Sequence, residues 1–290
     1  MVLGTNIRTY FNGSWHNEDV AVMKAADHGS WLGTNVFDGA RFFEGVHPDL
    51  DSHCARTNRS AEALMITPTV STQKMVEIVK EGLAMFPKDA AVYIRPMYWA
   101  LDGGHMGVAP KEGATGFAVC LEEIPMTPAA ASTTLTTTRF RRPTLDSAVV
   151  NAKAGCLYPN NARILLEAHS KGFDNALVTD ALGNVAETAT TNVFTVRDGE
   201  VFTPIANGCF LAGITRARHI KNMRANGYTV HETVMGYDDF RQADEVFVTG
   251  NMSKITAVSA FEDTRYNAGP ITRNVREMYW DWALSDAAQN

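Results

Sequence analysis

The sequence predicts an α+β protein with two domains, a smaller N-terminal α/β domain (residues 1–122) and a larger β-rich α+β domain (residues 133–290). Three observations carry this prediction. A chain of 290 residues that is 45% hydrophobic and 20% charged can build two modest cores. Its first part alternates extended and helical patterns, and strand and turn signals are frequent in its second part. Between them, "EIPMTPAAAS" (123–132) has two prolines and no periodicity, which is typical of an interdomain loop.

The N-terminal domain is predicted to contain strands and two helices. "TYFNGSW" (9–15) has the Asn-Gly signature of a hairpin, and "NVFDGARFFEG" (35–45) indicates a strand and a turn. Two segments open on Asp or Ser and space apolar residues three and four apart, which predicts capped amphipathic helices over 51–66 and 71–86. "AAVYIRPMYWA" (90–100) and "ATGFAVCLEEI" (114–124) are predicted strands.

The C-terminal domain begins with a Thr-rich strand, "STTLTTTRF" (132–140), and a helix is predicted after Lys153. Gly-Asn and Asp-Gly turns divide residues 175–204 into a β-meander. Residues 213–228 indicate a helix that stops at an Asn-Gly pair, and residues 243–258 indicate strand, turn and strand.

Composition excludes several classes of function. The net charge of −6 and pI near 5.8 give no basic surface for nucleic acid, since the densest basic run is "RFRR" (139–142). No stretch is apolar enough to span a membrane and the N-terminus lacks a signal-peptide pattern, so we expect a cytoplasmic protein. The four cysteines show no metal-site or disulfide spacing, which predicts reduced, mostly buried thiols and no metal.

Lys153 is the first candidate for chemistry. It lies between small residues in "NAKAGCLYPNNARILLEAH" (151–169), far from other basic residues, and a solvated surface lysine is the ordinary alternative. Glu187 is a carboxylate among small and apolar residues, and a helix is expected to start at Gly213, Ile214 and Thr215, where free N–H groups favour a phosphate. "TGNMSK" (249–254) offers a second turn for an anion. With a tyrosine five residues after the lysine, this set matches what pyridoxal phosphate requires.

The order of the motifs resembles the branched-chain aminotransferase family, whose members are fold-type IV enzymes that use pyridoxal phosphate. The resemblance runs from about residue 8 to about residue 275. It rests on "VFDGAR" (36–41), "SHCARTNRSA" (52–61), "YIRP" (93–96), "AKAG" with Tyr158 (152–158), "ETATTNVF" (187–194) and "AGITR" (212–216).

The resemblance implies the cofactor contacts. Lys153 corresponds to the Schiff-base lysine, Tyr158 to a partner of the cofactor's phenolic oxygen and Glu187 to the carboxylate on the pyridine nitrogen. Arg56 corresponds to the phosphate-binding arginine, and Arg59 is its competitor. Other cofactor positions are Asn192, Gly213, Ile214, Thr215 and Asn251, although Asn192 could instead be a buried structural residue.

The resemblance also implies a substrate pocket for an amino acid with an apolar side chain and for 2-oxoglutarate. Its residues are Phe37, Gly39, Arg41, Tyr93, Arg95 and Met252. Alternation along a strand points Tyr93, Arg95 and Met97 the same way. An arginine suits a carboxylate because its planar fork binds two oxygens, and an internal salt bridge is the alternative for Arg95.

One part of the sequence departs from the family pattern. Gly250, Asn251 and Met252 stand where the branched-chain enzymes usually have Gly-Thr-Ala. The substrate is therefore less tightly specified than the reaction, and three alternatives stay open: an (R)-selective amine or D-amino acid transaminase, an aminodeoxychorismate lyase, and a binding protein with a vestigial site. The resemblance further implies a homodimer or higher homo-oligomer, with the Gly-rich segment "LDGGHMGVAP" (101–110) as the candidate for a loop that closes the partner's pocket.

Overall fold

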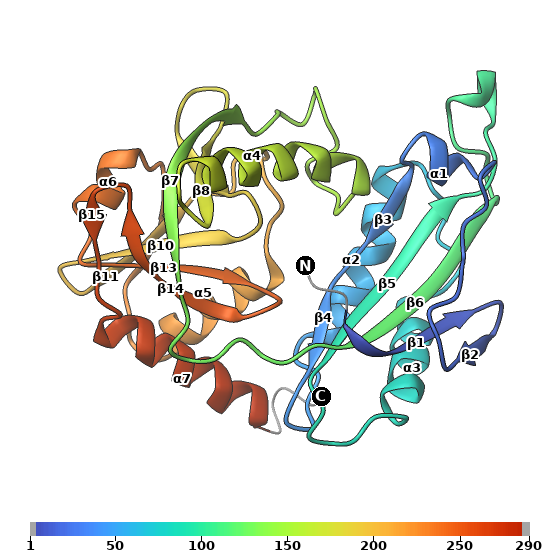
Figure 1. Ribbon diagram of the computed structural model, residues 1–290, viewed down its shortest axis with the longest axis horizontal. Helices are drawn as coiled ribbons and strands as arrows, with labels where there is room; N and C mark the ends of the chain where they lie inside the picture. The colour runs from blue at the N-terminus through green and yellow to red at the C-terminus, as the bar shows by residue number, and fades with distance from the viewer. Residues whose placement is uncertain (1–3, 286–290) are drawn as a thin grey trace. The chain divides into compact units, whose positions relative to one another are not determined.

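A computed structural model describes residues 4–285 of the chain (Figure 1). Within this part the chain forms two compact units. The first unit contains residues up to 126 together with residues 152–157, and the second contains residues 127–151 and the residues from 158 onward. The short segment that carries Lys153 therefore belongs to the first unit, although both of its neighbours in sequence belong to the second.

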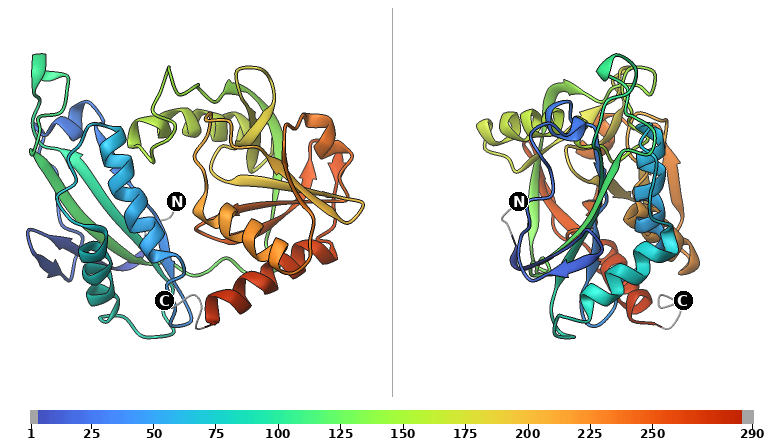
Figure 2. Two further views of the ribbon diagram at one scale, coloured as in Figure 1. Left: turned by 180° about the vertical axis from the view of Figure 1, so that it is seen from behind. Right: turned by 90° about the vertical axis from the view of Figure 1, so that its right-hand side faces the viewer.

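The first unit is an antiparallel sheet covered by two helices. Its strands pair in the order β2-β1-β6-β5-β3, and β4 also pairs with β5. Helices α2 and α3 pack on the same face of this sheet (Figure 2). The elements are β1 (Thr5–Phe11), β2 (Ser14–His16), α1 (His28–Trp31), β3 (Asn35–Phe37), β4 (Ala40–Phe42), α2 (Leu50–Ala63), α3 (Thr72–Leu83), β5 (Val92–Ala100), a 3-10 turn η1 (His105–Gly107) and β6 (Thr115–Glu123).

Local sequence explains most of these elements. Asn12 and Gly13 both have positive φ, at 50° and 84°, as the predicted two-residue hairpin requires. The Ser71 hydroxyl caps α3 by accepting from the Lys74 amide at 3.2 Å. The prediction of a side-chain cap at the start of α2 was wrong: the helix begins at Leu50, and its N-cap residue, Asp49, makes no side-chain cap hydrogen bond. Burial of Leu50 and Cys54 against the sheet supports this helix instead of a cap.

The second unit is built on a mixed sheet in the order β12-β11-β10-β13-β14-β7-β8-β9, with β15 on β14. β7 runs parallel to both β14 and β8, and β11 runs parallel to β12. The strands are β7 (Ser132–Arg141), β8 (Asn175–Thr179), β9 (Val185–Thr188), β10 (Asn192–Arg197), β11 (Glu200–Pro204), β12 (Val230–Thr233), β13 (Glu245–Gly250), β14 (Lys254–Phe261) and β15 (Thr264–Arg265). The helices of this unit are α4 (Tyr158–Ser170), α5 (Ile214–Ala225), α6 (Tyr237–Arg241) and α7 (Pro270–Leu284). The 3-10 turn η2 (Gly155–Leu157), just before α4, belongs to the first unit.

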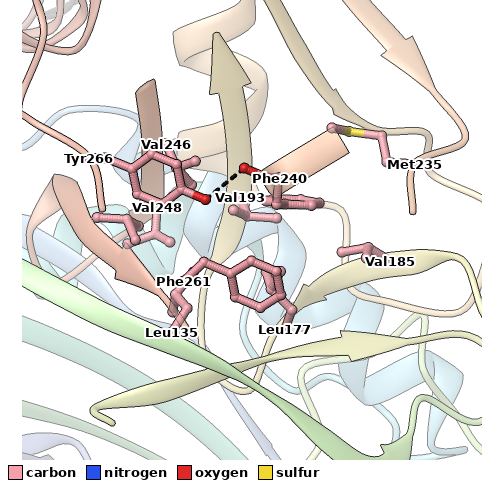
Figure 3. Packing of buried hydrophobic residues seen from close by; sticks show 11 residues of the cluster. Leu135, Leu177, Val185, Val193, Met235, Phe240, Val246, Val248, Phe261 and Tyr266 are labelled. Atoms are coloured by element: carbon pink, nitrogen blue, oxygen red, sulfur yellow. Dashed lines mark hydrogen bonds between the residues drawn. The ribbon is translucent and has the colours of Figure 1, made fainter. Parts of the chain in front are cut away.

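The two larger apolar clusters of the second unit pack its helices against the sheet. One fills the space between the sheet and α6, where Phe261 and Leu177 face each other and the Tyr266 hydroxyl donates to the Phe240 carbonyl at 2.6 Å (Figure 3). The other joins α5 and α7 to the sheet through the stacked rings of Phe194 and Phe247. The helix predicted over residues 213–228 is confirmed and ends before Asn226 and Gly227. The prediction of one β-meander over residues 175–204 was wrong: β8 pairs with β9 and β10 pairs with β11 as two hairpins, but β9 ends the sheet while β10 pairs with β13 on its other side. α1, α6 and α7 had no prediction.

No helix among the described residues is long and apolar enough to cross a bilayer. Of the four cysteines, Cys54 and Cys209 are buried, Cys120 is half-buried and Cys156 is exposed, and none forms a disulfide.

Candidate active site

Lys153 is fixed through its backbone. Its amide donates to the Ser60 hydroxyl at 3.0 Å, and its carbonyl accepts from the Phe37 amide at 3.1 Å. Val36 and Ala154 form a bridge beside it. A side chain at Gly155 would lie 2.1 Å from Asn35 Oδ1, which explains the glycine two residues after the lysine. The Lys153 ammonium lies 5.0 Å from the centre of the Phe37 ring, so two predicted site residues meet.

Arg56 lies against a buried carboxylate. Asp38, which is fully buried, accepts from Arg56 Nε at 2.5 Å and from Arg56 Nη2 at 2.8 Å, and it lies 2.7 Å from His53 Nδ1. Burial by itself would raise the pKa of Asp38, but Arg56 and His53 more than offset burial and hold the pKa well below its usual range. Arg59, the competitor, is exposed. Arg56 is therefore oriented by Asp38, a residue to which the sequence assigned no role.

The predicted substrate residues other than Met252 belong to the first unit, where they lie on or next to neighbouring strands. Arg41 of β4 pairs in register with Tyr93 of β5, and a side chain at Gly39 would lie 2.4 Å from the Tyr93 hydroxyl. Arg95 lies 5.7 Å from the Tyr93 ring centre and forms an ion pair with the buried Glu122. The internal salt bridge that was the alternative for Arg95 is thus present.

Arg41 is fully buried, and its Nη2 donates to the Ile124 carbonyl at 2.5 Å. Among the described residues, its Nε and Nη1 atoms have no hydrogen-bond partner. Burial lowers the pKa of Arg41 to about 10, so the guanidinium stays charged at neutral pH. Unsatisfied buried donors of this kind suit a carboxylate ligand.

Glu187 of β9 is the centre of a polar cluster in the second unit. Its Oε1 lies 3.0 Å from Arg142 Nε, an ion pair without the alignment of a hydrogen bond, and its Oε2 accepts from Asn192 Nδ2 at 3.3 Å. Arg142 is anchored in turn by the carbonyls of Thr188 and Ala189, at 2.8 and 2.9 Å. These contacts favour the ionised form of Glu187. Arg142 was not singled out from the sequence, where it is only part of the basic run 139–142.

Two turns of the second unit offer donors for an anion. Gly213 is the N-cap of α5 and provides no side-chain cap, so the first-turn N–H groups of Ile214 and Thr215 are left without an intrahelical acceptor. A side chain at Gly213 would lie 2.1 Å from Asn192 Oδ1. Asn192 also pairs in register with Thr249, two residues before Asn251. Among the described residues, Asn251 Nδ2 and Thr249 Oγ1 are buried without a hydrogen-bond partner.

The residues present fit pyridoxal phosphate. The orphaned donors at Thr249 and Asn251 and the uncapped start of α5 suit a phosphate, and Glu187 suits a protonated ring nitrogen. Tyr158 and Met252 are half-buried, at the start of α4 and in the β13–β14 turn. The predicted site residues of the first unit thus lie near one another, and so do those of the second unit. No group of side chains in the described part of the chain could hold a metal ion.

Comparisons with known proteins agree with this chemistry. The sequence matches the family described as "Amino-transferase class IV" over residues 35–261. A putative branched-chain-amino-acid aminotransferase of Methanocaldococcus jannaschii is 31% identical over 282 residues, which cover 95% of this chain and 96% of the relative. The branched-chain-amino-acid aminotransferase of Escherichia coli (strain K12) is 28% identical over 287 residues, which cover 93% of this chain and 91% of the relative.

Solved structures give the same result. A crystal structure of an aminotransferase from Brucella abortus bound to the cofactor PLP is 56% identical to this chain, with a TM-score of 0.95 and coverage of 96% and 99% of the two chains. The Escherichia coli branched-chain amino acid aminotransferase is 27% identical, with a TM-score of 0.86 and coverage of 95% and 94%. A family match over residues 35–261, on a fold that aligns nearly end to end, shows that this chain belongs to the class IV aminotransferases.

Proposed function

We propose that this aminotransferase uses pyridoxal phosphate to move an amino group between a branched-chain or similarly apolar L-amino acid and 2-oxoglutarate, in a ping-pong reaction. The observation that carries the proposal is the fixed position of Lys153, whose backbone is held by Ser60 and Phe37 while its amine lies 5.0 Å from the Phe37 ring centre. The names of the archaeal and Escherichia coli relatives support the substrate class.

Each group has a distinct task in this proposal. Lys153 would hold the cofactor covalently through its amine, and when a substrate amine takes that place, the freed lysine amine would accept and return a proton. Glu187, held by Arg142 and Asn192, keeps the ring nitrogen protonated. The cofactor, when bound, supplies an electron sink for the pair of electrons left by that proton. Arg41 offers two donors, unpaired among the described residues, for a substrate carboxylate, and Arg95, whose charge is already paired with Glu122, offers only its remaining donors.

The reaction is tested by replacing Lys153. The purified protein is expected to show the visible absorbance of bound cofactor and to lose it when an amino donor is added. Lys153→Ala is expected to hold the cofactor without a covalent bond, to show no such loss of absorbance with an amino donor, and to lose transaminase activity by several orders of magnitude. Lys171→Ala, at an exposed lysine of the second unit, is the control and should behave as wild type. A colourless protein that stays colourless with added pyridoxal phosphate would refute the proposal.

The substrate is tested by half-reactions with L-leucine, L-glutamate, D-alanine and (R)-1-phenylethylamine, each followed by loss of cofactor absorbance. The proposal expects L-leucine and L-glutamate to react fastest. Met252, half-buried in the altered turn, is far larger than the usual alanine, and this change leaves an (R)-amine or D-amino acid transaminase as the second candidate. Faster reaction with D-alanine or the amine would establish that alternative. Pyruvate release from an amino-chorismate substrate without a keto acid would establish the lyase.

The proposal includes a homodimer in the cytoplasm. Segment 101–110 supports a partner contact because Met106 and Val108 are 85% and 70% exposed, which is unusual for two neighbouring apolar side chains. The double substitution Met106→Ser and Val108→Ser is expected to weaken the dimer and raise KM, whereas Leu182→Ser, at a residue 87% exposed in another turn, should change neither. Light scattering and steady-state kinetics measure both. A fully active monomer would refute the proposal that a loop of one subunit helps to close the pocket of the other.

A further inference from the structure

The turn between β13 and β14 contains a lysine in an unusual setting. Gly250 pairs with Lys254 across a three-residue loop, and Lys254 has a left-handed backbone with φ at 64°. Glycine is the residue that adopts this conformation without strain. The Lys254 side chain is also fully buried, which is rare for a lysine. Both features disfavour a lysine at this position on grounds of stability alone, so a functional reason is needed.

The Lys254 ammonium determines which way the Asn251 amide points. Lys254 Nζ donates to Asn251 Oδ1 at 2.6 Å. An ammonium has only donors, so the amide oxygen must face it and the amide nitrogen must face away. That nitrogen, Asn251 Nδ2, is buried and has no hydrogen-bond partner among the described residues. Lys254 therefore turns Asn251 into an oriented donor with an unused hydrogen-bonding capacity.

Lys254 is also tied to the helix whose N-terminus forms the other half of the proposed phosphate site. His219 of α5 is fully buried, and its Nε2 lies 3.0 Å from the Lys254 carbonyl. The carbonyl can only accept, so Nε2 carries the proton and donates. Burial lowers the pKa of His219 to about 4, which keeps the ring neutral at physiological pH. The Lys254 ammonium further lies 5.7 Å from the ring centre of Tyr279, which packs on His219.

We propose that Lys254 is a positioning residue for the cofactor phosphate: its ammonium orients Asn251 so that Nδ2 donates to the phosphate, and its backbone links that donor to helix α5. This inference rests on the proposed phosphate site at Ile214, Thr215 and Asn251. Lys254 does not contact the phosphate in this proposal and acts on it through Asn251.

The test compares the affinities of the apoenzyme for pyridoxal phosphate and for pyridoxal, which lacks the phosphate. Lys254→Met keeps the length and volume of the side chain and removes the ammonium. It is expected to raise the Kd for pyridoxal phosphate about tenfold, as loss of an oriented donor to a charged group does, and to leave the Kd for pyridoxal within about twofold. Lys254→Gly, which suits the positive φ, is the second variant and should show the same selective loss. Both affinities are measured by absorbance and fluorescence titration.

A double-mutant cycle separates this role from a structural one. If Lys254 acts through Asn251, then Lys254→Met should cost little further affinity once Asn251→Ala has been introduced. Additive losses, or an equal loss of affinity for pyridoxal phosphate and pyridoxal, would overturn the proposal. An unchanged Kd for pyridoxal phosphate in Lys254→Met and Lys254→Gly would also overturn it. If wild-type apoenzyme does not prefer pyridoxal phosphate over pyridoxal, the phosphate site itself is wrong, and the role of Lys254 falls with it.

Discussion

At the scale of single residues, the candidate site depends on charges held by oppositely charged or polar neighbours. Arg56 is held by Asp38, and Glu187 is held by Arg142. A charge buried with its partner is stable, but the same charge without its partner is costly. Substitution of Asp38 or Arg142 should therefore be as damaging as substitution of the charged residue that each one holds.

Asp38→Asn is predicted to destabilise the protein by about 3 kcal/mol, because the Arg56 guanidinium loses its buried countercharge. The free energy of unfolding, from urea titration of the apoenzyme, measures this loss. Asp281→Asn, at an exposed residue of α7, is the control and should change stability by less than about 0.5 kcal/mol. Equal effects of the two substitutions would contradict the prediction.

The same carboxyl group predicts a dependence on pH. The pKa of Asp38 in the folded protein is held below its unfolded value, which is about 4. Its contribution to stability is therefore complete above pH ~4 and is lost as the pH falls toward the folded pKa. Wild-type protein should lose stability below pH ~4 more steeply than Asp38→Asn. Parallel pH profiles for the two proteins would show that Asp38 does not contribute to acid unfolding.

At the scale of elements, the start of α5 and strands β9 and β10 are mechanically linked. Gly213 at the helix start lies against Asn192 of β10, and Asn192 donates to Glu187 of β9. The phosphate end and the ring-nitrogen end of the proposed cofactor site therefore share one buried asparagine. A substitution at the phosphate end should therefore also shift the contacts of Glu187 at the ring-nitrogen end.

Gly213→Ala is predicted to raise the Kd for pyridoxal phosphate roughly tenfold or more, because the new methyl group would lie 2.1 Å from Asn192 Oδ1 and must displace it. Gly213 has ordinary backbone angles, so the effect comes from the clash alone. Gly236→Ala is a matched control, since Gly236 is also a helix N-cap and the nearest atom to its new methyl group lies 4.0 Å away. Similar affinities for the two variants would argue against the link through Asn192.

At the scale of the whole molecule, the chain forms two units, each with its own sheet. The proposed roles are divided between them, since Lys153 belongs to the first unit and Glu187 to the second. A ligand that binds only the folded protein stabilises it by mass action.

Removal of the cofactor is predicted to lower the thermal stability of the protein. At a cofactor concentration one hundred times Kd, binding contributes about 2.7 kcal/mol, which corresponds to a rise in Tm of roughly 5 °C or more for a chain of this size. Differential scanning fluorimetry of the apoenzyme with increasing pyridoxal phosphate measures the shift. Pyridoxine, which lacks both the aldehyde and the phosphate, is the control and should give no rise. The absence of a concentration-dependent rise with pyridoxal phosphate would contradict specific binding.

The sequence by itself determined the family, the α+β class, most of the strands and helices, and the identity of the candidate lysine. These are recoverable because strand and helix periods, Asn-Gly turns and ordered motifs are local patterns along the chain. The short helix α1 escaped prediction because it has too few residues for a period, and α2 lacked its expected cap because burial of Leu50 and Cys54 stabilises it instead.

Only the tertiary structure decided which charges meet. Arg95 with Glu122, Arg142 with Glu187, and Asp38 with His53 and Arg56 are pairings across strands and helices. The buried position of Lys254 is likewise a product of packing, since its neighbours in sequence gave no sign that its ammonium would lie on Asn251. Such contacts join residues from separate elements, and their energies depend on burial and distance, which no local pattern encodes.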